Sequence, residues 1–254
     1  MSVSRETGRG APGNARRLRK TLDALVARHR LGQAAAGQIE RILEALAAQP
    51  DPHTTVSEPQ AALEVHVADA LSGLEVSELA GARRIADIGA GAGFPGLVLA
   101  VALPQAQVDL IESAGRKTAV MDRLIQAGQV SNARSITTRA EQLGRVPAGV
   151  GGGREAYDAV TARAVGPLAM LVEYAAPLLR EGGVLVAWKG ARDADEEAGG
   201  AAAAGRLGME AGDVLPVRPF ESSENRHLHV FRKTSLTPEG FPRRPGMARK
   251  RPLR

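Results

Sequence analysis

The first 80 residues show apolar positions at helical spacing. Between residues 15 and 48, apolar side chains recur three or four positions apart, in the series Leu18, Leu22, Leu25, Val26, Ile39, Ile42, Leu43 and Leu46. This spacing predicts two amphipathic helices, divided near Gly32 and Gly37. A third helical stretch is expected over 60–80, ending at Gly81. The N-terminal third of the chain is therefore predicted to be helical.

From Arg83 onward, short apolar runs alternate with helical segments, as is typical of a parallel sheet with crossover helices. Strands are predicted at 84–88, 107–111, 134–137, 157–161 and 183–188, followed by strand-sized segments at 213–217 and 227–232. The pattern predicts an α/β fold with a doubly wound sheet, closed by an antiparallel pair at one edge. Residues 147–153 are expected to form a flexible surface loop, and 191–208 a weak helix or partly disordered segment.

Composition excludes several classes of protein. The 254 residues suffice for a sizeable core, and the absence of cysteine excludes disulfides, a thiolate zinc site and a cysteine nucleophile. No apolar run approaches the roughly 20 residues of a membrane helix, and the N-terminus lacks the apolar core of a signal peptide. A cytoplasmic location without membrane contact is expected.

Charge is distributed unevenly along the chain, whose net charge is +5. Residues 1–20 carry six basic side chains against one acidic, and residues 232–254 carry eight against one, so the body between them is acidic. Two basic ends suit a phosphate-rich partner, although solubilising tails have the same composition.

The stretch 87–96, DIGAGAGFPG, follows a predicted strand and precedes the helical run LVLAVAL. Glycines in this context let a ligand lie against bare amides, so Gly89, Gly91 and Gly93 are predicted to bind a cofactor. Glu112 ends the next predicted strand, where a carboxylate can accept the hydroxyls of a ribose. Together these features predict a cofactor that contains adenosine.

Two such cofactors compete, because residues 91–96 also match the G-x-G-x-x-G fingerprint of NAD-binding proteins. Asp87 favours S-adenosylmethionine, since its charge can hold a methionine ammonium and repels a diphosphate. Pro95 removes an amide that a diphosphate would need, and the residues after Glu112 complete one sheet without leaving a substrate domain. Methyl transfer is the favoured prediction, with an NAD-dependent oxidoreductase as the alternative.

Longer motifs resemble one family. They are DIGAGAGFPG at 87–96, LIESAGRKTAVM at 110–121, RAE at 139–141, YDAVTARAVGPL at 157–168, LVAWKG at 185–190, RHLHVFRK at 226–233 and TPEGFPRRPG at 237–246. Over about residues 60–246 the chain resembles the 16S ribosomal RNA guanine-N7 methyltransferases, also called the glucose-inhibited division protein B family. The resemblance implies methyl transfer from S-adenosylmethionine to N7 of a guanine in the 530 loop of 16S rRNA. A non-catalytic rRNA-binding assembly factor with the same fold remains an alternative.

The resemblance also implies an organisation of the chain and a set of cofactor contacts. A Rossmann-like core over 81–234 follows a helical extension over 15–80, with a basic disordered N-terminus at 1–14 and a basic C-terminal tail at 235–254. Family contacts are implied at Gly89 and Phe94, at the adenine-cradling pair Ala140 and Glu141, and at Arg163 beside the substrate pocket. The complete predicted cofactor set is Asp87, Gly89, Gly91, Gly93, Phe94, Glu112, Ala140, Glu141 and Arg163.

The expected partner is 16S rRNA or the small ribosomal subunit, bound by a monomer without a metal ion. The predicted RNA contacts are Lys189, Arg226, Arg243, Arg244, Arg249 and Lys250. His66 and Asp69 match the family's H-x-x-D segment; such a pair is more often a packing and hydrogen-bond feature than an active centre, so neither is predicted to be catalytic. Residues 53–56 replace the N-L-T stretch usual before this segment. Guanine N7 carries a lone pair and no proton, so no catalytic base is predicted.

Overall fold

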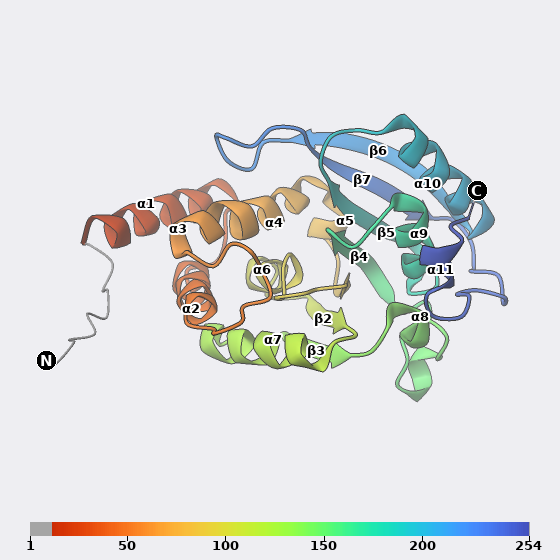
Figure 1. The fold of residues 1–254 in the computed structure, drawn as a ribbon, viewed down its shortest axis with the longest axis horizontal. Helices are drawn as coiled ribbons and strands as arrows, with labels where there is room; N and C mark the ends of the chain where they lie inside the picture. The colour runs from red at the N-terminus through yellow and green to blue at the C-terminus, as the bar shows by residue number, and fades with distance from the viewer. Residues whose placement is uncertain (1–11, 254) are drawn as a thin grey trace, which may run out of the picture.

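The computed structural model describes residues 12–253 and contains one seven-stranded sheet (Figure 1). The strand order is β3-β2-β1-β4-β5-β7-β6, in which the first five strands are parallel and β7 is antiparallel to both β5 and β6. The strands are β1 Arg84–Ile88, β2 Gln107–Glu112, β3 Ala133–Thr137, β4 Tyr157–Arg163, β5 Leu179–Lys189, β6 Met209–Val217 and β7 Arg226–Lys233. The predicted doubly wound sheet with an antiparallel edge is confirmed.

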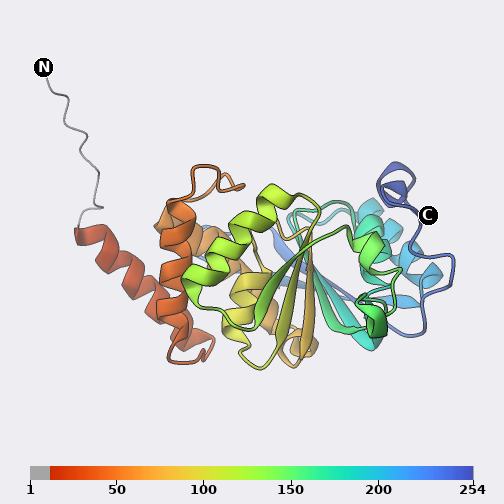
Figure 2. The same cartoon turned by 90° about the horizontal axis from the view of Figure 1, so that it is seen from below.

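Helices cover both faces of the sheet (Figure 2). One face packs on α6 (Gly96–Ala102) and α7 (Gly115–Gly128). The other packs on α8 (Ala140–Leu143), α9 (Leu168–Ala175) and α10 (Ala194–Arg206). Apolar side chains alternate between the two faces along the parallel strands β1, β2, β4 and β5, which produces two cores separated by the sheet.

The N-terminal helices extend the first of these cores at one end of the molecule (Figures 1 and 2). They are α1 Pro12–Arg28, α2 Ala35–Ala47, α3 Pro59–Ala62, the π-helix η1 Leu63–Ala68, α4 Asp69–Leu71, the 3-10 helix η2 Ser72–Glu75 and α5 Ser77–Ala80. The predicted boundary near Gly37 is wrong, because this residue lies inside α2 and the break falls before Ala35. Leu22, Leu43 and Leu79 are fully buried, so the extension packs as part of the same body.

Gly96 sets the distance between α6 and the sheet. A Cβ atom at this position would lie 2.4 Å from Leu110 Cδ2 and 2.7 Å from Asp87 Cβ. Since no side chain fits there, α6 lies directly against β1 and β2. The loop before it, residues 89–95, which we call the glycine loop, is thereby held at the carboxyl edge of the sheet.

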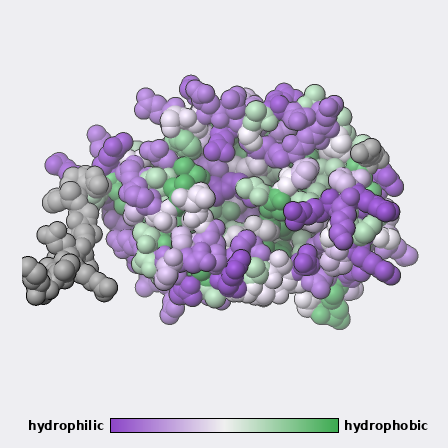
Figure 3. Space-filling model, viewed as in Figure 1, coloured by the Kyte–Doolittle hydropathy of each residue, from purple (hydrophilic) through white to green (hydrophobic). Residues whose placement is uncertain are grey.

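The C-terminal residues are packed against the core, which corrects the expectation of a free basic tail. Arg145 donates two hydrogen bonds to the carbonyl of Pro242, and Arg154 donates to the carbonyls of Phe241 and Thr237. The segment ends in α11 (Met247–Lys250), where Ala248 is buried. Hydrophilic side chains gather over α11 and the adjoining chain (Figure 3). We call residues 235–253 the C-terminal segment.

The stretches predicted as a flexible loop (147–153) and as a weak helix or partly disordered segment (191–208) differ in structure. Residues 191–208 contain the ordinary helix α10, capped by Asp193, whose carboxylate accepts from the amides of Asp195 and Glu196. Residues 147–153 hold the 3-10 turn η3 (Ala148–Val150) and expose Val150. No helix within residues 12–253 is long and apolar enough to cross a membrane.

Candidate functional site

Three adjoining cavities lie where the parallel strands end. The Glu112 cavity, about 600 Å³, is lined by Gly89, Glu112, Ala140 and Glu141, among others. The His66 cavity, about 360 Å³, is lined by the glycine loop, His66, Asp69 and Arg163. The Lys189 cavity, about 810 Å³, lies between the loop after β4 and Trp188 to Gly190. Ala164 lines all three cavities, so they meet at this residue.

Ala164 itself has a left-handed backbone, with φ at +57°. Such a conformation is uncommon for a residue with a Cβ atom and concentrates at functional sites. It turns the chain after β4 so that residues 164–167 form a wall between the Glu112 and Lys189 cavities.

Glu112 ends β2 with its carboxylate at the floor of the Glu112 cavity. Its Oε1 accepts from the amide of Ala114 at 3.0 Å, and Lys117 Nζ lies 3.4 Å from Oε2. Burial alone would raise the pKa of this carboxyl, but the Ala114 amide and the Lys117 charge outweigh it and lower the pKa overall. The site therefore holds an ionised acceptor where a ribose diol is expected.

Ala140 and Glu141 begin α8 and form another wall of the same cavity. Glu141 is buried, and its Oε1 accepts from the amide of Gly246 at 2.9 Å. Burial and the Glu141 carboxylate raise the pKa of Tyr174, which also lines the cavity, to about 12. The C-terminal segment thus closes one side of the Glu112 cavity through Gly246 and Arg249.

The glycine loop separates the Glu112 and His66 cavities. Gly89 has a φ of +65°, and a Cβ atom there would lie 2.7 Å from Val165 Cγ2. The amides of Gly91 and Ala92, which line the His66 cavity, have no acceptor within residues 12–253. Because Pro95 precedes α6 and the Gly96 amide donates to Asp87, the start of this helix offers little to a diphosphate.

Asp87 does not lie at the surface of any of the three cavities, contrary to the expectation that it holds an ammonium directly. It is fully buried, and its oxygens accept from the Gly96 amide and from Thr161 Oγ1, both at 2.9 Å. Burial raises its pKa to about 6. Asp87 therefore fixes the start of α6 against the sheet rather than lining a cavity.

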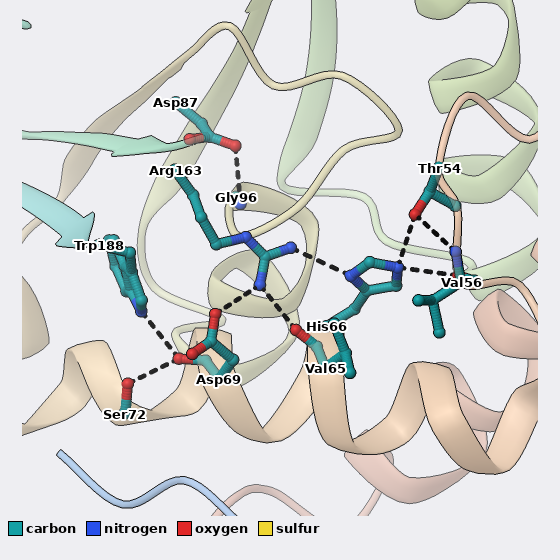
Figure 4. Close-up of polar contacts among 10 residues, drawn as sticks. All are labelled: Thr54, Val56, Val65, His66, Asp69, Ser72, Asp87, Gly96, Arg163 and Trp188. Carbon is teal, nitrogen blue, oxygen red and sulfur yellow. Dashed lines mark hydrogen bonds and ion pairs between the residues drawn. The ribbon is translucent and has the colours of Figure 1, made fainter. Parts of the chain in front are cut away.

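Arg163, at the end of β4, is joined to the H-x-x-D segment (Figure 4). Its Nη1 donates to Asp69 Oδ2 at 2.8 Å and to the carbonyl of Val65 at 3.0 Å. Its Nη2 lies 3.2 Å from His66 Nδ1. The predicted site residue Arg163 and the two residues of the H-x-x-D segment thus form one cluster, which faces the glycine loop.

His66 is held in one neutral tautomer. Its Nε2 lies 2.9 Å from the carbonyl of Val56, which requires a proton on Nε2, so Nδ1 accepts from Arg163. Burial, followed by the Arg163 charge, lowers the pKa of His66 to about 4. The ring stacks on Phe94 with centroids 4.8 Å apart, which links η1 to the glycine loop.

Two residues that sequence reasoning missed complete this cluster. Thr54 Oγ1 lies 3.0 Å from His66 Nε2, so the stretch that departs from the family's N-L-T pattern supports the histidine. Trp188 Nε1 donates to the carbonyl of Asp69 at 2.8 Å. The H-x-x-D match pointed to this region, but the partners lie too far away in the chain for local spacing to reveal them.

The family model described as "rRNA small subunit methyltransferase G" matches residues 47–221. This range includes the H-x-x-D segment, the glycine loop and the ends of the parallel strands at which the three cavities lie. The chain belongs to this family. The family's protein from Roseiflexus castenholzii is 44% identical over 67% of this chain and 70% of its own length. Its protein from Desulfitobacterium hafniense is 36% identical over 79% of this chain and 81% of its own.

Solved structures support the fold of this family member. A mutant of MtNAS in complex with S-adenosylmethionine is 12% identical and has a TM-score of 0.51, covering 86% of this chain and 77% of the other. The fibrillarin pre-rRNA processing protein of Methanococcus jannaschii is 17% identical with a TM-score of 0.50, covering 73% and 77%. The predicted family, methyltransferase class and cofactor, S-adenosylmethionine, are confirmed, and the oxidoreductase alternative is wrong.

The basic residues predicted to bind RNA divide into two groups in this methyltransferase. Lys189 is paired with Glu196 at 2.6 Å, and Arg243 forms two bonds to the buried carboxylate of Glu173. Arg243 is therefore reassigned to anchoring the C-terminal segment. The remaining four are Arg226, which lines the His66 and Lys189 cavities, and the exposed Arg244, Arg249 and Lys250.

Within residues 12–253, no three histidine or acidic side chains are grouped as a metal site requires.

Proposed function

We propose that this chain transfers a methyl group from S-adenosylmethionine to N7 of a guanine in the 530 loop of 16S rRNA. Family membership supports the reaction class and the kind of RNA. The observation that carries the proposal at residue level is the meeting of three cavities at Ala164, since a two-part cofactor and a base must share one point.

The Glu112 cavity fits the adenosine part of the cofactor. It combines an ionised carboxylate at the end of β2 with the α8 wall, at the place where doubly wound sheets bind nucleotides. Gly89 permits the cofactor to approach the backbone closely, because this residue has no side chain beside Val165. The His66 cavity, which shares Gly89, Lys117 and Ala164 with it, fits the methionine part.

The Lys189 cavity fits the target base. It shares Arg163 and Ala164 with the His66 cavity and opens beside Arg226. A guanine entering it must leave its stack or come from a loop, as for other enzymes that modify bases. Arg226, Arg244, Arg249 and Lys250 suit contacts with the surrounding phosphates.

Bound S-adenosylmethionine supplies an electrophilic methyl group. The chain's own task is orientation, because guanine N7 has a free lone pair and needs no proton removed; reacting atoms must be held about 3 to 3.5 Å apart. His66 is unsuited to act as a base, since its Nδ1 lone pair is engaged by Arg163. The rigid cluster of His66, Asp69 and Arg163 fixes the walls within which this orientation takes place.

The test is incubation of the purified protein with small ribosomal subunits from cells that lack the gene, using labelled S-adenosylmethionine. The proposal expects label in 16S rRNA, from a monomeric protein of the cytoplasm. Naked 16S rRNA is assayed in parallel to determine the form of the substrate. Label in protein alone, or none in either RNA sample, would contradict the proposal.

A further inference from the structure

One buried carboxylate oxygen at the site has no partner. Asp69 is buried, with its side chain 3% exposed, and its Oδ2 accepts from Arg163 at 2.8 Å. Its Oδ1 is buried and accepts no hydrogen bond from residues 12–253. An unsatisfied acceptor of this kind costs about 1 to 3 kcal/mol or more in a folded protein, so a native one calls for an explanation.

The backbone of Asp69 is held in place by two hydrogen bonds, whereas its carboxylate is tied to the protein through Oδ2 and Arg163. The carbonyl of Asp69 accepts from Trp188 Nε1 at 2.8 Å and from Ser72 Oγ at 2.6 Å (Figure 4). The residue follows directly after the π-helix η1, a kind of irregularity that is frequent at functional sites. Backbone and carboxylate are thus anchored from three elements, β4, β5 and the η2 turn.

The surroundings of Asp69 identify the chemistry of the missing donor. Among the described residues that line the His66 cavity, Asp69 supplies the only carboxylate, beside the cations Lys117, Arg163 and Arg226. The amides of Gly91 and Ala92 add further donors. One carboxylate among several cations and amides is complementary to a zwitterion that presents one ammonium and one carboxylate group.

Asp87 cannot provide the same contact, because both of its oxygens are engaged within the protein. Asp69 also does not line the Lys189 cavity, so it is poorly placed to meet the target base. We infer that the Asp69 carboxylate pairs with the α-ammonium of S-adenosylmethionine, and that a turn of this carboxylate on binding brings the unpartnered Oδ1 to the cavity to accept a hydrogen bond from it. This inference rests on the proposed function, because it requires that cofactor in the Glu112 and His66 cavities.

Arg163 then has two roles in one cluster. Its hydrogen bonds to Asp69, Val65 and His66 use three of its five N–H donors, which leaves two for a ligand carboxylate. The Asp69–Arg163 pair therefore matches the two charges of an α-amino acid, and His66 holds the pair against Phe94 of the glycine loop. The H-x-x-D segment becomes part of the cofactor site.

Calorimetric titration of three ligands tests this assignment. S-adenosylhomocysteine carries the α-ammonium, its deaminated analogue carries hydrogen in that place, and 5′-methylthioadenosine lacks the amino acid. The unaltered protein should bind S-adenosylhomocysteine roughly 10- to 100-fold more tightly than the deaminated analogue, as for a hydrogen bond between charged groups. This comparison needs no variant and therefore no assumption about folding.

The Asp69→Asn variant should lose the same factor for S-adenosylhomocysteine and none for the other two ligands. The matched control is Asp158→Asn, which removes the charge of a carboxylate paired with Arg180 at the opposite edge of the sheet. It should leave all three affinities unchanged.

Three outcomes would overturn the inference. In the first, Asp69→Asn weakens the binding of all three ligands equally, which indicates a structural role. In the second, the variant binds S-adenosylhomocysteine as tightly as the unaltered protein does. In the third, the variant loses only RNA binding, which assigns Asp69 to the target base. In each case binding by the unaltered protein still supports the proposed function. Failure of the unaltered protein to bind S-adenosylhomocysteine would overturn that function together with the inference.

Discussion

Replacing His66 with glutamine should change the pH dependence of stability in a defined direction. In the folded protein burial and the Arg163 charge hold the pKa of His66 at about 4, whereas the unfolded chain has the ordinary value of 6.5. Between these values the unfolded chain binds more protons, so the free energy of unfolding falls as the pH falls. Linkage gives a loss of about 2 kcal/mol between pH 7 and pH 5 from this residue.

Asp87 works in the opposite direction over the same range. Burial raises its pKa from 3.8 to about 6, so the folded protein binds the extra proton and gains about 1 kcal/mol between pH 7 and pH 5. In the wild-type curve the two contributions therefore cancel in part. Subtracting the free energy of unfolding of His66→Gln from that of wild type at each pH cancels the Asp87 contribution. The remainder is the contribution of the histidine.

Urea denaturation at pH 7, 6 and 5 measures this difference. The stability of wild type relative to the variant should fall by about 2 kcal/mol across the series, with unchanged m-values. The proton resonances of the His66 ring provide an independent measure and should not titrate above pH 5. A ring that titrates near 6.5, or a difference in stability that is constant with pH, would refute the tautomer and the Arg163 contact.

Three further predictions follow from the contacts at the site. Gly89→Asp should abolish binding of S-adenosylmethionine in calorimetry, because the left-handed backbone and the neighbouring valine leave no room for a side chain; ordinary binding heats would contradict this. Arg243→Ala should cost about 3 kcal/mol in denaturation by leaving a buried carboxylate unpaired, whereas Arg244→Ala should cost about 0.5 kcal/mol or less. Joint reversal of Arg244, Arg249 and Lys250 to glutamate should reduce the salt slope of rRNA binding by about 0.7 for each phosphate that is no longer neutralised, and an unchanged slope would refute their role.

Most of the fold could be predicted from local sequence patterns. Strands such as 84–88 and the glycine loop after it could be predicted because apolar period and glycine spacing act within a few residues. The crossover topology then followed from the alternation of strands and helices. Helix 194–206 was harder to predict because its alanines and glycines have weak amphipathicity, and its cap at Asp193 depends on one side chain.

The site was less predictable where it depends on distant partners. His66 and Arg163 are 97 positions apart, and nothing in the H-x-x-D spacing reveals that a guanidinium will meet the imidazole. Asp87 lies at the predicted strand end, but the approach of α6 and Thr161 occupies both its oxygens. Likewise, Arg243 belongs to a basic run by composition, while the buried Glu173 on α9 determines its place.

Methylation of one guanine at N7 is the proposed activity of the chain, and mapping of that modification in 16S rRNA is its sharpest test. N7-methylguanosine makes an RNA strand susceptible to chain cleavage after reduction, and primer extension then locates the break. We expect one cleavage in the 530 loop of 16S rRNA that is absent without the gene and restored by the wild-type protein, but not by Gly89→Asp. The same cleavage in cells without the gene, or full restoration by that variant, would contradict it.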